Sequence, residues 1–182
     1  GNLIETIHPS TFDNIYRLKY LDLSNNRLKQ VPSNRINNLC SVLTLNLSNN
    51  QIIALNKNSL FAFRGVNELD LSRNNIEIIE PATFIMNRKL HNLNLSFNCL
   101  KSVTSWIGSL DLIDFALAFN QLTAIEDVIY QMQNLRRIHI EGNYIKQIDT
   151  DSILRSSIVY MHYDEDKLKA EDVAKIQSIF EM

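Results

Sequence analysis

The sequence predicts an α/β solenoid in which short parallel strands stack into one concave sheet of about seven strands, followed by a C-terminal helix. Three observations predict this fold. The pattern L-x-x-L-x-L-x-x-N-x-L occurs six times in full without losing phase, and asparagine occurs 22 times in 182 residues. After residue 168, apolar residues instead come three and four positions apart, which is the period of a helix.

The composition indicates a folded domain with its own core. The chain has 45% hydrophobic residues, 21% charged residues and only 4 glycines. Its formal net charge of -2 creates no extended positive field, so we expect no nucleic-acid partner. No stretch approaches the roughly 18 consecutive apolar residues of a membrane-spanning helix, so we expect no membrane span in this chain.

The strands follow from the Leu-x-Leu centre of each unit. In the first full unit, Leu21 and Leu23 point to one face while Asp22 and Ser24 point to the other, because side chains alternate along a strand. One such strand cannot bury its own apolar face, so we expect the units to stack in parallel about 4.8 Å apart. A half unit, six full units and one degenerate unit are predicted to form a single array over residues 1–168.

One asparagine in each full unit is predicted to belong to a buried structural ladder. Its side chain offers two N–H donors and one acceptor, so it can pair with backbone groups that a bend leaves without partners. In the seventh unit Asp166 takes this position, and an ionised carboxylate cannot donate, so the array is expected to end there. The ladder positions are Asn26, Asn50, Asn74, Asn98, Asn120 and Asn143.

Residues 169–182 are predicted to form a separate helix. Val173, Ile176 and Phe180 share one face, and two acidic residues lie in the first turn, where the helix dipole favours them. The helix either caps the last strand with this apolar stripe or begins a longer coiled coil.

The repeat resembles the leucine-rich repeat family over residues 2–168. From Asn2 to Asp166, successive asparagine positions are 24, 24, 24, 24, 22, 23 and 23 residues apart. The phrase Ile76-x-x-Ile79-x-Pro81-x-x-Phe84 resembles the 24-residue class of extracellular animal proteins. This resemblance implies a horseshoe fragment in a secreted or cell-surface protein, similar to Toll-type receptors, adhesion proteins and insect leucine-rich immune proteins. In those immune proteins a helical region after the repeats mediates dimerisation, so the resemblance also implies dimerisation through residues 169–182 as an open alternative.

Catalytic motifs are missing from the sequence. No G-x-x-x-x-G-K-[ST], G-x-S-x-G, H-E-x-x-H or C-x-x-C occurs, so we expect neither an enzyme nor a cofactor. The leading prediction is recognition of a protein ligand through the concave face. An intracellular, cytoplasmic scaffold or regulatory adaptor is the alternative, and a structural module that polymerises through an exposed strand edge is a third reading.

The start of the array and the two cysteines leave the compartment open. Because the array begins inside a unit without a polar cap, we expect the chain to be a fragment of a longer protein. Cys40 and Cys99 lie about 2.5 repeat units apart, which is too far for a disulfide. We expect both to be free, buried thiols.

The later units carry the predicted binding surface. Units one to four repeat the phrase Asp/Asn-Leu-Ser, whereas units five to seven depart from it. Phe97 and Phe119 precede the ladder asparagine in neighbouring units, and Ile113, Ala116 and Ala118 are expected to extend this apolar area. An apolar centre with an aromatic and cationic margin is typical of interface hot spots, while the alternative is that both rings pack over the sheet edge or under the helix. The predicted partner-binding residues are Phe97, Ile113, Asp114, Phe119, Arg136, Arg137, His139, Tyr160 and His162.

The same units also carry a candidate cation site. His139 and His162 occupy one column of the stacked strands, and Glu141 and Asp164 occupy the next, so the four side chains could converge on a metal ion. A metal site also needs a tuned outer shell, so we expect a solvated surface and no metal. A milder hypothesis is that the two histidines make binding sensitive to acid.

Two glycosylation acceptors fit the rule N-x-[ST], at Asn46 and Asn94. Both arise automatically from the Asn-Leu-Ser phrase of the strands, so the motif alone is weak. If they carry glycans, these would crowd the early concave face and move recognition toward units five to seven.

Overall fold

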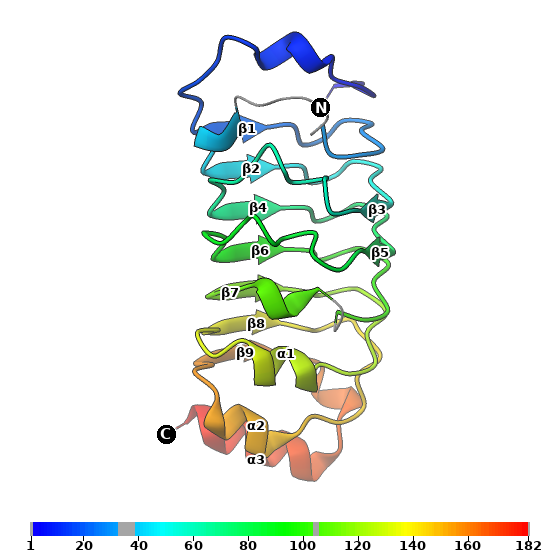
Figure 1. Cartoon of the computed structure of the whole chain (residues 1–182). Helices are drawn as coiled ribbons and strands as arrows, with labels where there is room; N and C mark the ends of the chain where they lie inside the picture. The colour runs from blue at the N-terminus through cyan, green and yellow to red at the C-terminus, as the bar shows by residue number, and fades with distance from the viewer. Residues whose placement is uncertain (1, 33–38, 104–105, 182) are drawn as a thin grey trace.

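The computed structural model describes residues 2–32, 39–103 and 106–181 of the chain. In these ranges, seven strands form one parallel sheet in the order β1-β2-β4-β6-β7-β8-β9, which confirms the predicted solenoid. Figure 1 shows the strands stacked one above the next, from β1 near the N-terminal end to β9 near the C-terminal end. The strands are β1 (Tyr20–Asp22), β2 (Thr44–Asn46), β4 (Glu68–Asp70), β6 (Asn92–Asn94), β7 (Asp114–Ala116), β8 (Arg137–His139) and β9 (Tyr160–His162).

Each strand turns its middle residue into the core. Pairing is in register from unit to unit, so that Leu45 faces Leu69 and Leu69 faces Leu93 across adjacent strands. All three leucines are buried. A slip by one residue would expose this whole row, because side chains alternate between the two faces. The exact register therefore also lines up the outward side chains into columns.

The return segments change character along the stack. In the early units two short strands, β3 (Ala54–Leu55) and β5 (Ile78–Ile79), form a second parallel sheet, seen on the right of Figure 1. In the later units the return segments instead contain short helices, which begin at a later position of the unit and which the sequence did not predict. They are α1 (Glu126–Gln131) and α2 (Thr150–Arg155), and 3₁₀ turns occur at Pro9–Phe12, Leu39–Ser41, Ile107–Ser109 and Glu165–Lys167.

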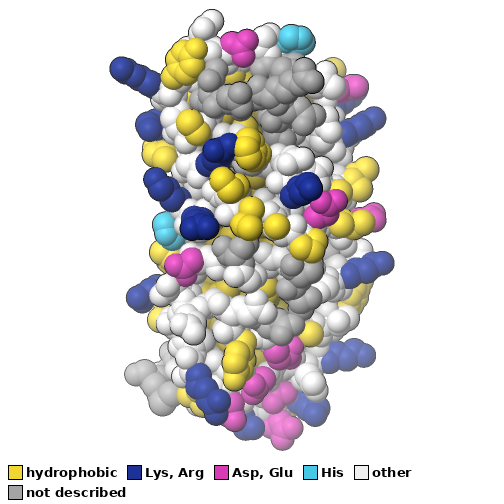
Figure 2. Space-filling view, viewed as in Figure 1, with side chains coloured by type: hydrophobic (Ala, Val, Ile, Leu, Met, Phe, Trp, Pro, Cys, Tyr) yellow, Lys and Arg dark blue, Asp and Glu magenta, His cyan; other side chains and the backbone are white. Residues whose placement is uncertain are grey.

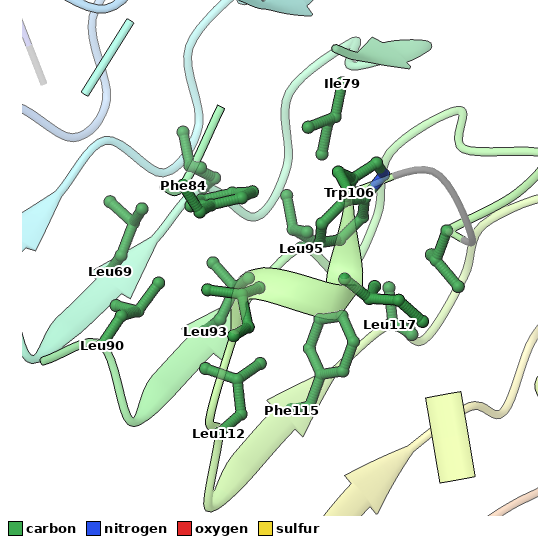
Figure 3. Close-up of a cluster of buried hydrophobic side chains, with 14 of the residues drawn as sticks. Leu69, Ile79, Phe84, Leu90, Leu93, Leu95, Trp106, Leu112, Phe115 and Leu117 are labelled. Carbon is green, nitrogen blue, oxygen red and sulfur yellow. The ribbon is translucent and has the colours of Figure 1, made fainter. Parts of the chain in front are cut away.

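The apolar core runs the length of the stack and is aromatic at its centre. Trp106 packs between Phe84 and Phe115, with ring centroids 5.4 Å and 6.2 Å away respectively. Figure 3 shows these rings beside the leucines of the neighbouring strands, among them Leu93 and Leu117. All three aromatic side chains are buried, so they join the sheet to the return side of the coil.

The ladder asparagines link consecutive units. Asn74 Nδ2 donates to the carbonyl oxygen of Leu71 in its own unit and to that of Leu47 in the preceding unit, both at 3.0 Å. Its Oδ1 accepts from the backbone N–H of Ile52, also at 3.0 Å. The same pattern reaches Asn143, the last ladder position. Each side chain thus satisfies backbone groups of two units at once.

After the last strand the chain forms α3 (Ala170–Phe180). Ile176 is fully buried, Val173 and Phe180 are half-buried, and α3 lies next to α2, as Figure 1 shows. Among the described residues, no helix is both long enough and apolar enough to cross a membrane.

Both cysteines are free, as expected, but the prediction that they are buried was wrong. Cys40 is exposed, because the 3₁₀ turn at Leu39–Ser41 buries Leu39 and leaves its neighbour facing solvent. Cys99 is only half-buried, immediately after the ladder residue Asn98.

Candidate protein-binding face

The last three strands of the sheet present their outward side chains in columns. Strand β7 pairs with β8 and β8 pairs with β9 without any slip, so equivalent positions lie side by side. The columns continue for two residues beyond the strand ends, where the chain begins to turn. In strand order they are Asp114, Arg137, Tyr160, then Ala116, His139, His162, and then Ala118, Glu141, Asp164.

A stack of side chains runs along the edge of the sheet where β4, β6 and β7 end. The rings of Phe97 and Phe119 lie parallel, with centroids 4.4 Å apart and planes 11° apart. The Arg73 guanidinium lies 4.2 Å from the Phe97 ring centre, which is a cation–π contact. Phe119 covers Gly142, where an added Cβ would come within 2.4 Å of the ring. The stack leaves Phe97 38% exposed and Phe119 47% exposed.

The backbone that carries this stack is left-handed. Phe97 and Phe119 have φ angles of 59° and 54°, and Arg73 has 54°. Such angles cost an ordinary side chain on the order of 1–2 kcal/mol, whereas asparagine and glycine adopt them more readily. The first two units indeed place Asn25 and Asn49 at this position. The later units therefore hold bulky side chains at a position where asparagine would make the fold more stable.

Hydrogen bonds to the next unit impose this conformation. The backbone N–H of Phe97 donates to the Ala118 carbonyl at 2.8 Å, and that of Phe119 donates to the Glu141 carbonyl at 2.7 Å. The backbone therefore fixes where both Cβ atoms point. The rings are presented on a rigid frame and lose little conformational freedom when a partner covers them.

The columns beside the stack are aromatic and charged. The His139 ring lies 5.4 Å from the Tyr160 ring and 6.1 Å from the His162 ring. Arg137 Nε contacts Asp114 Oδ2 at 2.7 Å, but both side chains are partly exposed, so this ion pair adds little stability. Tyr160 itself is 46% exposed. This region thus combines apolar rings with charges of both signs.

The third column is more strongly hydrogen-bonded. Asp164 Oδ2 accepts from the Gly142 N–H at 2.8 Å and from Lys167 Nζ at 2.7 Å. Partial burial raises the pKa of Asp164, but these hydrogen bonds and the Lys167 charge outweigh it, so the pKa lies below its ordinary value. Asp164 is therefore a carboxylate at neutral pH, and its Oδ2 is already hydrogen-bonded to Gly142 and Lys167.

Two shallow hollows mark the concave face. One, of about 380 Å³, lies between the stack and the histidine column and is lined by Arg73, Phe97, His139 and Glu141 among others. A second, of about 480 Å³, extends from β2 to β8 over mainly amide and carboxylate side chains. Asn46 and Asn94 line this second hollow, and each side-chain oxygen accepts from the N–H of the serine two residues later. Figure 2, seen from the same side as Figure 1, shows apolar, basic and acidic side chains mixed over the visible surface.

The structure does not bring all of the predicted binding residues together. Ile113 and Arg136 lie where strands enter the sheet, whereas Phe97 and Phe119 follow the strand ends, on the order of 15–20 Å away at about 3.3 Å per residue. Ala118 is only 4% exposed, so the prediction that it extends the exposed apolar area was wrong. Sequence reasoning also missed Arg73 as a member of the stack, although it occupies the same repeat position as Phe97.

The in-register coils and their asparagine ladder define a solenoid repeat protein. A family model described as leucine rich repeat matches residues 1–52 and 40–100, so the chain belongs to the leucine-rich repeat family. No curated protein sequence matches the chain significantly.

Solved structures share the fold. A chain of the Drosophila Toll–Spätzle complex is 22% identical, with a TM-score of 0.79 over 89% of this chain and 24% of its own length. A chain of the TLR13 complex with single-stranded RNA is 24% identical, with a TM-score of 0.69 over 81% of this chain and 24% of that one. The APL1 leucine-rich repeat domain is 21% identical, with a TM-score of 0.69 over 90% of this chain and 47% of that one. The chain thus spans about a quarter of the length of the first two.

Proposed function

We propose that this chain is a non-catalytic recognition module that binds a protein ligand on the concave face of its later units. The observation that carries the proposal is the half-exposed Phe97–Phe119 stack on a left-handed backbone. The repeat gives this position a left-handed backbone in every full unit, so phenylalanine in place of asparagine costs stability that the fold does not require, which supports a functional role. Aromatic residues, phenylalanine included, and arginine are also enriched in the buried centres of protein interfaces.

The stack offers enough apolar surface to anchor a ligand. Phe97 and Phe119 are 38% and 47% exposed, which for side chains of about 200 Å² leaves roughly 170 Å² to be covered. At about 25 cal/mol per Å², full coverage contributes up to about 4 kcal/mol. Losing such an anchor weakens a complex by about two to three orders of magnitude. The contact would therefore dominate a ligand's affinity.

The charges around the stack favour a protein ligand over a nucleic acid. Arg137 is paired with Asp114, and Glu141 lies beside the two histidines, so no continuous basic strip follows the concave face of β7 to β9. With a net charge of -2 the chain lacks the field that draws in a phosphate backbone. Because the TLR13 structure contains RNA, single-stranded RNA is included as a competitor in the test below.

A secreted or cell-surface protein, of the adhesion, receptor or innate-immune kind, is the proposed setting. The named proteins with the same fold support it, since Toll is described in development and innate immunity. An intracellular scaffold or adaptor stays the alternative, and the free thiols of Cys40 and Cys99 suit it. Occupied glycans on Asn46 or Asn94 in the natural protein would exclude the alternative. Dimerisation through α3 stays a prediction that sedimentation of the purified chain would test.

The test compares three versions of the chain as bait in extract and extracellular fluid of the source organism. Phe97→Asn with Phe119→Asn removes the stack but installs the residue that the first two units use at this position. The matched control is Phe61→Asn, because Phe61 is also 44% exposed and also has an arginine, Arg64, 4.0 Å from its ring centre.

We expect the wild type and the control to retain the same protein and the double variant to lose it, with all three melting temperatures similar. Equal retention by all three would place recognition elsewhere. A large fall in melting temperature for the double variant alone would show that the stack serves stability instead. Displacement of the retained protein by single-stranded RNA would point to a nucleic-acid ligand.

A further inference from the structure

We propose that His139, Glu141 and His162 bind one divalent transition-metal ion of the Zn²⁺ class on the concave face. The inference does not depend on the proposed function, because it concerns the chain alone. Each of the three side chains offers a ligand atom, and these atoms lie within 4.8 Å of one another. The sequence pattern places the two histidines in one column, but it does not give this distance.

The sheet holds the three ligands in place. His139 and His162 are register partners on β8 and β9, and Glu141 lies two residues after His139, on the same face. The His162 carbonyl accepts from the Ile140 N–H at 2.8 Å, which locks the two strands together at this level. Ligands on rigid strands need little reorganisation when an ion binds.

The distances suit a tetrahedral site. With metal–ligand bonds of about 2.0–2.2 Å, the ligating atoms of such a site lie about 3.4 Å apart. His162 Nδ1 already lies 3.3 Å from Glu141 Oε1. The two imidazole rings stand nearly perpendicular, at 84°, with centroids 6.1 Å apart. His162 is exposed, so its ring is free to make the remaining small rotation.

A buried oxygen points to a ligand. The Glu141 side chain is 18% exposed, and its Oε2 is buried without a hydrogen-bond partner among the described residues. A buried carboxylate oxygen that lacks a partner is costly, on the order of several kcal/mol when the group is charged. A cation held between this carboxylate and two imidazoles would compensate the carboxylate's charge in this partly buried place.

The donor set selects the ion. Two imidazole nitrogens and one carboxylate suit zinc and its neighbours, whereas Mg²⁺ and Ca²⁺ prefer oxygen ligands alone. Asp164 does not complete the set, because its Oδ2 is taken by the Gly142 N–H and Lys167. Three protein ligands leave the fourth position open, as in zinc sites that bind water or a further ligand.

The lysine of the adjacent column is already neutralised. Lys167 Nζ donates to Asp164 Oδ2 at 2.7 Å and to the Asn143 carbonyl at 3.1 Å. It therefore belongs to the adjacent column and does not compensate Glu141. Arg137, on the other side, is paired with Asp114.

Isothermal titration of the purified chain with ZnCl₂ tests the site, at a pH where imidazole is neutral. The variants are His139→Gln, Glu141→Gln and His162→Gln. His91→Gln is the matched control, because His91 is an exposed histidine outside the cluster. A Cys40→Ser, Cys99→Ser chain excludes binding by the free thiols.

We expect one Zn²⁺ per chain, an affinity reduced by more than about tenfold in each cluster variant, and no change in either control. Zinc should also raise the melting temperature of the wild type and of the controls only. No binding up to millimolar zinc, equal binding by all variants, or binding lost in the cysteine variant would overturn the proposal. Because no partner is present in these measurements, their failure would leave the proposed recognition of a protein untouched.

Discussion

The asparagine ladder makes a quantitative prediction at Asn74. Replacing Asn74 with Ala leaves the buried Ile52 N–H without its acceptor, which costs about 1–3 kcal/mol. It also removes the two 3.0 Å bonds to the Leu47 and Leu71 carbonyls. Each of those contributes only about 0.5–1.5 kcal/mol.

The loss of the two bonds to carbonyl oxygens should cost an amount near the lower limit of this range, because the neighbouring ladder asparagines still donate to the same carbonyls. Asn50 Nδ2 also donates to the Leu47 carbonyl, and Asn98 Nδ2 also donates to the Leu71 carbonyl, each at 3.0 Å. The expected loss in the free energy of unfolding for Asn74→Ala is therefore about 2–5 kcal/mol.

Urea unfolding, followed by the fluorescence of the single tryptophan, measures this loss. The control is Asn75→Ala, which replaces the next residue, an exposed asparagine, and should change stability by less than about 0.5 kcal/mol. A cost for Asn74→Ala no larger than that of the control would refute the stabilising role of the ladder.

Three further predictions concern the stack, the core and a helix cap. Gly142→Ala places a side chain on a left-handed backbone and against the Phe119 ring, so it should lower the free energy of unfolding by more than about 1–2 kcal/mol. The loss should be smaller in a Phe119→Asn chain, and an equal loss in both backgrounds would contradict the contact. Trp106→Ala should cost about 3–5 kcal/mol by calorimetry, because it removes the ring between Phe84 and Phe115, and a cost below 1 kcal/mol would show that this core is loosely packed. The hydrogen bond from the Ser152 side chain lowers the pKa of Asp149, the N-cap of α2, below 3.8. A folded-state pKa below 3.8 stabilises the fold above pH 3.8, and this stabilisation is lost as the pH falls through the folded pKa. Asp149→Ala should therefore lower the melting temperature more at pH 7 than at pH 2.

The repeat pattern was sufficient to predict the sheet but not the return side. Leu-x-Leu and the following asparagine recur in phase. The positions of the strands, the row of buried leucines and the columns of outward side chains could therefore all be predicted from the sequence. Helices α1 and α2 have six residues each, too short for periodicity alone to reveal. They form because tertiary packing buries residues such as Val128, Ile129 and Ile153 against the core.

The candidate site divides in the same way. Register placed His139 beside His162, and repeat position placed Phe97 beside Phe119, so both neighbourhoods could be predicted from the sequence. The exposure of each side chain could not be predicted, because it depends on the packing of neighbouring units; Ala118 is buried, as are Ser72 and Ser96 at the same repeat position. Nor could the left-handed backbone beneath the stack, since the residues that usually signal it are glycine and asparagine.

The most direct test of the central claim is the affinity of the captured protein for the three chains, measured by titration calorimetry. Recognition through the stack predicts that Phe97→Asn with Phe119→Asn weakens binding by more than about 30-fold, as expected for an anchor worth at least about 2 kcal/mol. Phe61→Asn should bind as the wild type does. An unchanged affinity for the double variant, or an equal loss in both variants, would contradict the assignment of ligand binding to this face.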